Sequence, residues 1–241
     1  MPFFITFLAG LATLIGYLFI YLDNRDNTVL IGSLGFASGV MFYISLFDLI
    51  PESIKLISSN YNIIVSILIS FIFIISGIIL SSILDKFISF ENSSLYRVGI
   101  ISMIALIFHN IPEGIATYIT SNFNLTFGLT LAISIALHNI PEGISISIPI
   151  YYSTNSKSKA FLYTLISGMS EFLGAILASL FIRNPSFLFM GSLYSVIAGI
   201  MLYISIYELL PTSLNYKRYL VTIFSFILGV VFIYVSILLI N

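Results

Sequence analysis

The 241-residue sequence contains no cysteine and no tryptophan, only two histidines, and few charged residues. Without cysteine there can be no disulfide, no thiolate metal site and no cysteine nucleophile. Charged residues make up 8% of the chain, against about 25% in soluble domains, and 59% of the residues are hydrophobic. The sequence therefore predicts an integral membrane protein. The net charge of −1 offers no basic surface for nucleic acid.

Long apolar runs fill almost the whole chain. A run of about 20 apolar residues is long enough to cross a bilayer as a helix. Dividing the sequence at its polar breaks predicts eight helices, at residues 2–22, 28–51, 62–84, 96–121, 125–151, 159–182, 186–211 and 218–240. The first run has no basic start and no cleavage site, so we expect a retained helix. We expect an all-α polytopic membrane protein with a single domain over residues 1–241.

Basic residues predict how the helices are oriented. One set of loops carries Arg25, Lys86, Arg97, Lys157, Lys159, Lys217 and Arg218, whereas the opposite set carries only Lys55 and Arg183. Because cytoplasmic loops are enriched in lysine and arginine, both chain termini are predicted to lie outside the cytoplasm.

Two distant segments repeat one another. Residues 39–53 read GVMFYISLFDLIPES and residues 199–213 read GIMLYISIYELLPTS, with eight of fifteen positions identical. In the predicted topology these segments cross the membrane in opposite directions, as the inverted repeats of secondary transporters do. We expect a 3+2+3 arrangement, in which helices 1–3 and 6–8 are related triplets around helices 4 and 5.

A six-residue phrase, HNIPEG, occurs at residues 109–114 and again at 138–143, and it contains both histidines of the chain. A helix has 3.6 residues per turn, so each histidine and the glutamate four positions later share a face. The asparagine lies about 100° round from its histidine, and the glutamate falls between the two directions. One glutamate could therefore serve two adjacent ligand positions. The prolines, Pro112 and Pro141, should kink each helix just before its glutamate and free backbone carbonyls there.

Five acidic residues lie within predicted spans, and no lysine or arginine lies deep in any of them: Asp48, Glu113, Glu142, Glu171 and Glu208. An ionised group at the bilayer centre costs at least about 2.5 kcal/mol, so such carboxylates take up protons or surround a cation. The two histidines favour a cation. Imidazole, carboxylate and amide ligands suit zinc, iron(II), manganese and cobalt rather than copper(I).

Less specific interpretations of these residues stay open. A single His-x-x-x-Glu can be an intrahelical pair that satisfies itself, although two matching copies favour a site. Glu171 can be a protonated carboxyl with a structural role. Asp48 and Glu208 stand three residues before prolines near helix ends, where a carboxylate can reach the membrane surface.

These motifs resemble the ZIP family of divalent-metal transporters, and in particular its bacterial branch. The resemblance rests on the doubled HNIPEG phrase, on Ser-Gly-x-x-Glu-x-x-Gly at residues 167–174, and on the paired Ser-x-x-(Asp/Glu)-Leu-x-Pro segments at residues 45–51 and 205–211. It covers essentially the whole chain. It implies eight spans, extracytoplasmic termini, a multi-pass position in the bacterial cytoplasmic membrane, and a homodimer with an elevator-like motion.

The resemblance also implies a two-metal centre between helices 4, 5 and 6. One site, associated with zinc, would use His109, Glu113, His138 and Glu142. The neighbouring site, associated with iron, would use Asn110, Glu113, Asn139, Glu142 and Glu171, so that two glutamates bridge. Some relatives have aspartate where this chain has Asn139, which lowers the negative charge of the second site. The histidine-rich cytoplasmic loop of many eukaryotic members is missing.

We therefore predict a secondary transporter, not an enzyme. Its expected cargo is zinc, with iron, manganese, cobalt and cadmium as further candidates, and zinc and iron are bound as cargo rather than as cofactors. The chain has no P-loop with which to use ATP. One alternative is a gated metal channel, whose uptake would not saturate. Another is an intramembrane metal-dependent hydrolase, which needs three fixed ligands, an open water position and a general base. The sequence contains no HExxH motif.

Overall fold

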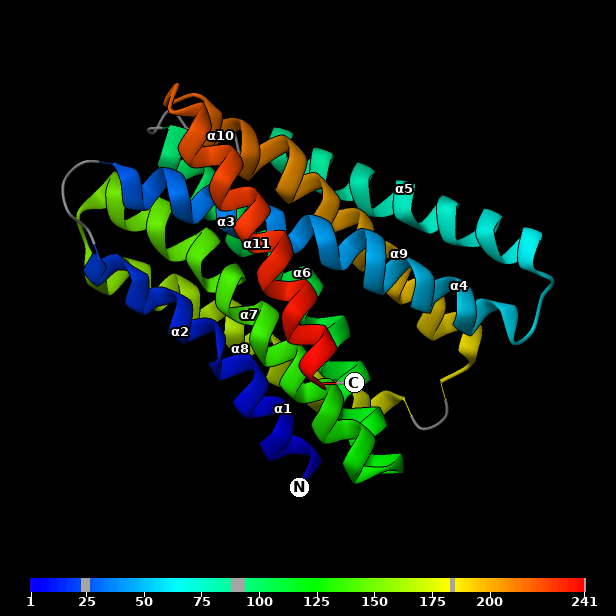
Figure 1. Ribbon diagram of the computed structural model, residues 1–241. Helices are drawn as coiled ribbons and strands as arrows, with labels where there is room; N and C mark the ends of the chain where they lie inside the picture. Colours follow the sequence, from blue (N-terminus) through cyan, green and yellow to red (C-terminus); the bar gives the residue numbers. More distant parts are fainter. Residues whose placement is uncertain (23–26, 88–93, 183–184, 241) are drawn as a thin grey trace.

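The computed structural model describes residues 1–22, 27–87, 94–182 and 185–240, and all regular structure in these ranges is helical (Figure 1). The elements are α1 (Pro2–Leu11), α2 (Thr13–Tyr17), η1 (Leu18–Leu22), α3 (Thr28–Ile44), η2 (Ser45–Leu49), α4 (Ile50–Ser58), α5 (Ile63–Phe87), α6 (Ser94–Phe123), α7 (Leu125–Thr154), α8 (Lys157–Phe181), α9 (Phe187–Tyr203), η3 (Ile204–Leu209), α10 (Leu210–Leu214) and α11 (Tyr219–Ile240).

Eight helical segments of the described chain are long and apolar enough to cross a membrane, which confirms the predicted all-α class and the number of spans. They are Pro2–Leu22, Thr28–Ser58, Ile63–Phe87, Leu95–Phe123, Leu125–Thr154, Lys157–Phe181, Phe187–Leu214 and Tyr219–Leu239. Arg25 and Arg183, which entered the orientation argument, and residues 88–93 of the longest predicted loop lie outside the described residues.

The predicted ends at Pro51 and Pro211 are wrong, because these helices continue to Ser58 and Leu214. In both, the backbone widens into a π-helix just before the proline, in η2 and η3. Each proline then falls in the first turn of the next α-helical segment, where its missing N–H costs no hydrogen bond. The repeated sequence segments thus adopt the same irregular local structure.

Pro112 and Pro141 lie inside α6 and α7, and neither proline ends its helix. The changes of helix type within the described spans lie elsewhere. They are the two π-helical turns, the 3-10 turn η1 and a one-residue interruption at Ala12 between α1 and α2. Both prolines thus lie within continuous helices, beside the expected ligands.

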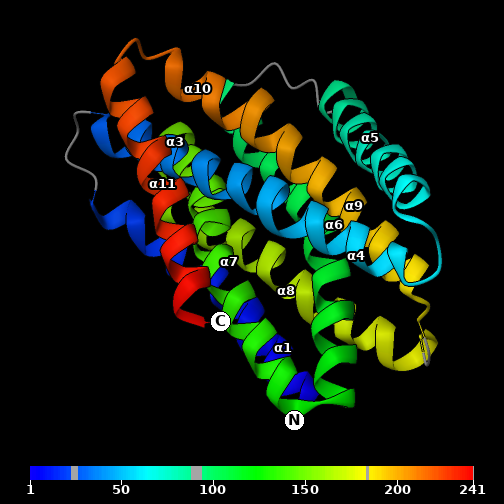
Figure 2. The same cartoon turned by 45° about the vertical axis from the view of Figure 1, so that its right-hand side comes forward.

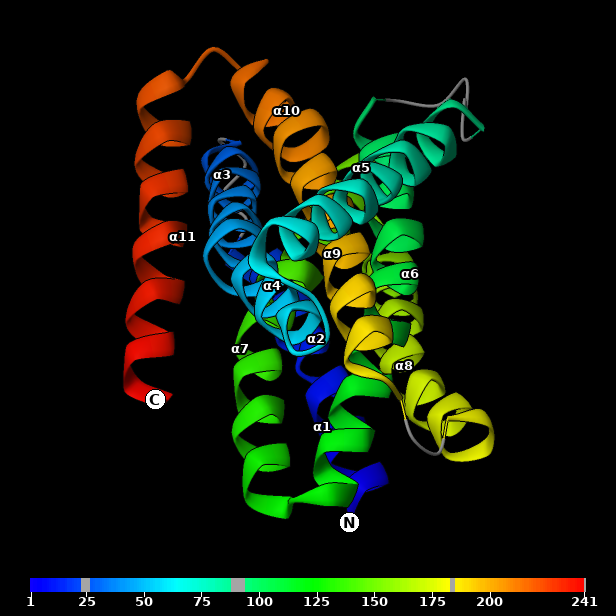
Figure 3. The same cartoon turned by 90° about the vertical axis from the view of Figure 1, so that its right-hand side faces the viewer.

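The helices form two groups. In one, α11 packs against α3 and α5 packs against α9; the α3–α4 and α9–α10 segments run in opposite directions (Figures 1 and 2). In the other, α1 and α2 pack with α6, α7 and α8. Figure 3 shows both termini and the turn between α6 and α7 in the lower half of the molecule.

Glycines bring the helices of the first group into backbone contact, and these contacts occur in equivalent pairs. A Cβ atom on any of four glycines would collide with a carbonyl oxygen of the neighbouring helix. The pairs are Gly39 with Phe226 and Gly199 with Ile74, and Gly229 with Phe36 and Gly77 with Val196. Residue 39 therefore corresponds to 199, and 74 corresponds to 226, in the same contact.

The second group follows the same rule. Gly143 meets the carbonyl oxygen of Thr13 as Gly114 meets that of Glu171, and Gly16 meets Ile140 as Gly174 meets Ile111. Gly10 and Gly168 meet each other's carbonyl oxygens. In these contacts α1–α2 corresponds to α8, and α6 corresponds to α7.

Candidate metal centre

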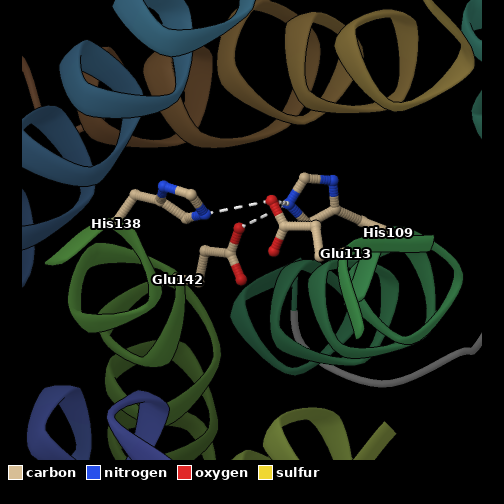
Figure 4. Close-up of side chains that lie close together, drawn as sticks. All are labelled: His109, Glu113, His138 and Glu142. Atoms are coloured by element: carbon tan, nitrogen blue, oxygen red, sulfur yellow. Dashed lines mark hydrogen bonds and ion pairs between the residues drawn. The ribbon is translucent and has the colours of Figure 1, made fainter. Parts of the chain in front are cut away.

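Four ionisable side chains meet between α6 and α7. Figure 4 shows His109 and Glu113 projecting from α6 towards His138 and Glu142 of α7. One ligand atom from each residue lies within 4.8 Å of all the others. None of the four residues is more than 5% exposed. The structure therefore brings together the four residues of the first expected site, as a group that could hold a metal ion.

The close contacts within this cluster are poorly directed. Nε2 of His109 lies 3.2 Å from Oε1 of Glu113 and 2.9 Å from Oε1 of Glu142. Even so, both His109 nitrogens and both Glu142 oxygens lack a hydrogen-bond partner within the described chain. Only His138 makes a well-directed hydrogen bond, from Nε2 to Oε1 of Glu113 at 3.0 Å. An intrahelical pair that satisfied itself would not leave these atoms unpartnered.

The unpartnered atoms suit a divalent cation. Leaving buried polar atoms without partners costs about 1–3 kcal/mol each, and more when they are charged. An ion between the two imidazoles and the two carboxylates would satisfy them together, and its two positive charges would balance the two carboxylates. Mixed imidazole and carboxylate ligands are typical of zinc sites.

Each glutamate has a second oxygen turned away from the histidines, towards α1–α2 and α8 (Figure 4). Among the residues the structure describes, Oε2 of Glu113 and Oε2 of Glu142 have no hydrogen-bond partner. Each carboxylate thus offers one oxygen to the histidine side and one to the opposite side. This arrangement fits two carboxylates that bridge a pair of adjacent sites.

Asn110, Asn139 and Glu171 lie beside this cluster, fully buried. The amide Nδ2 of Asn110 donates to the Ser167 carbonyl at 3.0 Å, whereas that of Asn139 donates to the Ala9 carbonyl at 2.9 Å and to Oε2 of Glu171 at 2.8 Å. Oδ1 of both asparagines and Oε1 of Glu171 have no partner in the described part of the chain. The amide groups are therefore fixed through nitrogen, which leaves their oxygens available.

The same geometry argues against a purely structural Glu171. A protonated carboxyl group in a structural role would donate its proton to an acceptor. Oε2 of Glu171 instead accepts from Asn139, and Oε1 has no partner in the described ranges. A cation ligand accounts for both oxygens.

A small cavity of about 80 Å³ reaches the cluster at Glu113 and His138, and Asp48, Glu52 and Tyr194 line it. The last three also line a wider cavity of about 440 Å³. Asp48 therefore faces the path that leads to the cluster. The sequence analysis missed Glu52 and Tyr194. Glu52 could have been found, since it stands four residues after Asp48 and a helix places such residues on one face.

Glu208, which occupies the position of Asp48 in the other repeat segment, has a different environment. It is 7% exposed, and its carboxyl group lies near that of Asp85. Asp85 also forms an ion pair with Arg97 of α6 and accepts a hydrogen bond from the Tyr203 hydroxyl at 3.2 Å. Glu208 is thus held in a polar cluster with Asp85, Arg97 and Tyr203 rather than beside the histidines.

The fold and the site together define a multi-pass α-helical membrane protein with a buried histidine and carboxylate centre. A family model described as "ZIP Zinc transporter" matches residues 90–237. The chain is 37% identical over 272 residues to the "Zinc transporter ZupT" of Clostridium perfringens, covering 99% of this chain and 95% of that protein. The protein of the same name from Streptococcus mutans is 38% identical over 255 residues, covering 98% and 96%. The chain belongs to the ZIP family.

Membership in this family has two consequences. The family consists of transporters and not of enzymes, so the hydrolase alternative is set aside. The eight apolar helices and the bacterial relatives place the chain in the cytoplasmic membrane as a multi-pass protein, with lipid and divalent metal ions as its partners.

Proposed function

We propose that this protein is a secondary transporter that carries Zn²⁺ into the bacterial cytoplasm through a binuclear site. The first subsite consists of His109, Glu113, His138 and Glu142. The observation that carries the proposal is their convergence as buried, largely unpartnered ligand atoms at the inner end of a cavity. Relatives over nearly the full chain are named zinc transporters, in agreement with this ligand set.

The second subsite in this proposal consists of Asn110, Asn139 and Glu171, with Glu113 and Glu142 bridging. Its support is the set of unpartnered oxygens on the side away from the histidines. Because all its donors are oxygens, it suits harder cations than the first subsite does. We propose iron(II) for this subsite, with manganese, cobalt and cadmium as further substrates of the transporter.

We further propose that the chain is one domain built as an inverted repeat, with both termini outside the cytoplasm. The paired glycine contacts support the repeat, as do the two π-helical turns at equivalent positions. In this orientation the Asp48 cavity opens to the outside. A divalent ion that moves inward then gains about 4.6 kcal/mol per 100 mV of membrane potential.

The two helix groups offer a route to alternating access. The group that carries the metal ligands, α1–α2 with α6–α8, would move against the group of α3, α5, α9 and α11, so that the site faces each side in turn. An elevator-like motion and a homodimer are part of this proposal on the strength of the family resemblance alone. Light scattering of the detergent-solubilised protein would measure the oligomeric state.

Zinc uptake into metal-free proteoliposomes tests the proposal. Wild-type uptake should saturate with zinc concentration, and Glu142→Ala should abolish it. Ser153→Ala is a matched control on the same helix, since that hydroxyl bonds only the Ile150 carbonyl of its own helix in the described structure. Uptake that rises without saturation would instead support a channel. A folded wild-type protein without uptake, under either polarity of the membrane potential, would refute transport.

A further inference from the structure

Thr13, the first residue of α2, has a buried hydroxyl group that its own helix does not satisfy. It is fully buried, yet Oγ1 has no hydrogen-bond partner among the described residues. A buried threonine in a helix normally donates to the carbonyl four residues earlier. Thr6 does so to Pro2 at 3.1 Å, and Thr164 does so to Ala160 at 2.8 Å. Thr13 lacks this bond, as does the equally buried Thr117 of α6 in the described structure.

The carbonyl that Thr13 would use is that of Ala9. This oxygen already accepts from Nδ2 of Asn139 at 2.9 Å and from the Ala12 backbone N–H at 3.1 Å. The Ala9 carbonyl oxygen thus already accepts a hydrogen bond from an asparagine of the candidate metal centre. The hydroxyl of Thr13 needs another partner, because leaving it unsatisfied costs free energy.

The paired contacts show where Thr13 stands in the repeat. Gly143 meets the Thr13 carbonyl as Gly114 meets that of Glu171. In the same way, Asn139 donates to the Ala9 carbonyl as Asn110 donates to that of Ser167. Ala9 precedes Thr13 by four residues, as Ser167 precedes Glu171. Thr13 therefore occupies, on α1–α2, the position that Glu171 occupies on α8.

The side chain of Thr13 also lies where this correspondence predicts. Its Oγ1 would be 3.1 Å from a Cβ atom placed on Gly168, one turn before Glu171. Conversely, Oε2 of Glu171 would be 3.4 Å from a Cβ atom placed on Gly10, one turn before Thr13. Both helices lie on the side to which the second oxygens of Glu113 and Glu142 turn (Figure 4).

We infer that the Thr13 hydroxyl is a neutral oxygen ligand of the second metal subsite, opposite Glu171. This inference rests on the second subsite proposed above and adds a helix to it, since α1–α2 supplied none of the expected ligands. A hydroxyl donor completes the oxygen ligands of a hard cation such as iron(II) or manganese(II). It adds no charge to a centre that already holds three carboxylates.

Competition in proteoliposomes tests this role. The labelled substrate is zinc, and the competitors are Fe²⁺ under anaerobic conditions and Mn²⁺. Thr13→Val keeps the branched shape but removes the hydroxyl, whereas Thr13→Ser keeps the hydroxyl. Thr6→Val is the matched control, because Thr6 is equally buried on α1 and its hydroxyl bonds its own helix.

We expect Thr13→Val to raise the Fe²⁺ and Mn²⁺ concentrations for half-inhibition about tenfold, as loss of a metal-supporting group does. The half-saturating zinc concentration should stay within about twofold of wild type. Thr13→Ser and Thr6→Val should both resemble wild type. If Thr13→Val does not reach the membrane, Thr13→Ala is used in its place with the same expectation.

Two results would overturn the inference. One is unchanged competition in Thr13→Val together with weakened competition in Glu171→Gln; the second subsite would then stand without Thr13. The other is equal loss in Thr13→Ser and Thr13→Val, which would show that packing and not the hydroxyl is responsible. Unchanged competition in both Glu171→Gln and Thr13→Val would instead refute the second subsite itself.

Discussion

Equivalent helices of the proposed repeat share their packing contacts but differ in the side chains that carry chemistry. The glycine at residue 39 and the glycine at residue 199 make the same backbone approach to a neighbouring helix. At other equivalent positions the side chains differ: residue 13 is a threonine where residue 171 is a glutamate, and Asp48 lines a cavity whereas Glu208 is buried near Asp85. Similar backbone packing can therefore support different side-chain environments. In the described structure the cavity that reaches the cluster lies on the side of Asp48.

The glycine contacts are the strictest part of this symmetry, and breaking them should have the largest effect. Gly39→Ala and Gly199→Ala each place a Cβ atom against a backbone carbonyl, which cannot move without shifting a helix. We expect each to lower the free energy of unfolding by about 1–3 kcal/mol, and by similar amounts. Thermal unfolding in detergent measures the loss of stability. It can be followed by tyrosine fluorescence, since the chain has no tryptophan, or by light scattering.

Gly32→Ala is the matched control on the same helix pair. Its Cβ atom would lie 3.3 Å from the Ser225 hydroxyl oxygen, which can rotate away. We expect a change within about 0.5 kcal/mol. If Gly199→Ala lowers the free energy of unfolding clearly less than Gly39→Ala does, the two glycine contacts do not contribute equally to stability.

The sequence predicted the spans and the first ligand cluster well because each depends on local spacing. The HNIPEG phrase places a histidine and a glutamate on one helix face, and the two copies meet as expected. The π-helical turns were not predicted, since a proline in a sequence does not reveal whether the chain ends its helix or absorbs the proline. The significance of Thr13 also escaped prediction, because it depends on which carbonyl Asn139 occupies across the bundle.

The proposed repeat predicts that the side chains of residues 13 and 171 can be exchanged. Glu171→Thr alone should raise the Fe²⁺ concentration for half-inhibition of zinc uptake about tenfold. The double variant Thr13→Glu with Glu171→Thr should recover most of that loss, since the carboxylate returns from the opposite side. The same competition assay measures both. Failure of the double variant, with normal folding and zinc uptake, would show that the correspondence of these positions does not extend to metal binding.

Substitutions of Asp48 and Glu208 should have smaller effects, which test whether zinc reaches the cluster through the cavity lined by Asp48. Asp48→Asn removes a negative charge from the cavity that leads to the cluster, so the local concentration of cations falls. We expect the half-saturating concentration of external zinc to rise about threefold and to depend less on ionic strength. Glu208→Gln should leave that concentration unchanged. Uptake measured at two salt concentrations tests both, and equal effects of the two variants would contradict the asymmetry.

The smallest effect should come from a hydroxyl cluster at one of two equivalent helix contacts, the contact of α4, α5 and α9. Ser195 lies 2.5 Å from Ser53 and 2.8 Å from Ser70 through their hydroxyl oxygens. In the equivalent contact of α3, α10 and α11, the hydroxyl oxygens of Ser213 and Thr222 lie 2.8 Å apart. Gly35 occupies the position there that corresponds to Ser195. Since two hydroxyls suffice there, Ser195→Ala should cost only about 0.6 kcal/mol, or about 2 °C in melting temperature. If Ser195→Ala lowers the free energy of unfolding as much as Gly39→Ala does, the contact of α4, α5 and α9 depends on its third hydroxyl. The packing would then be less symmetric than the glycine contacts indicate.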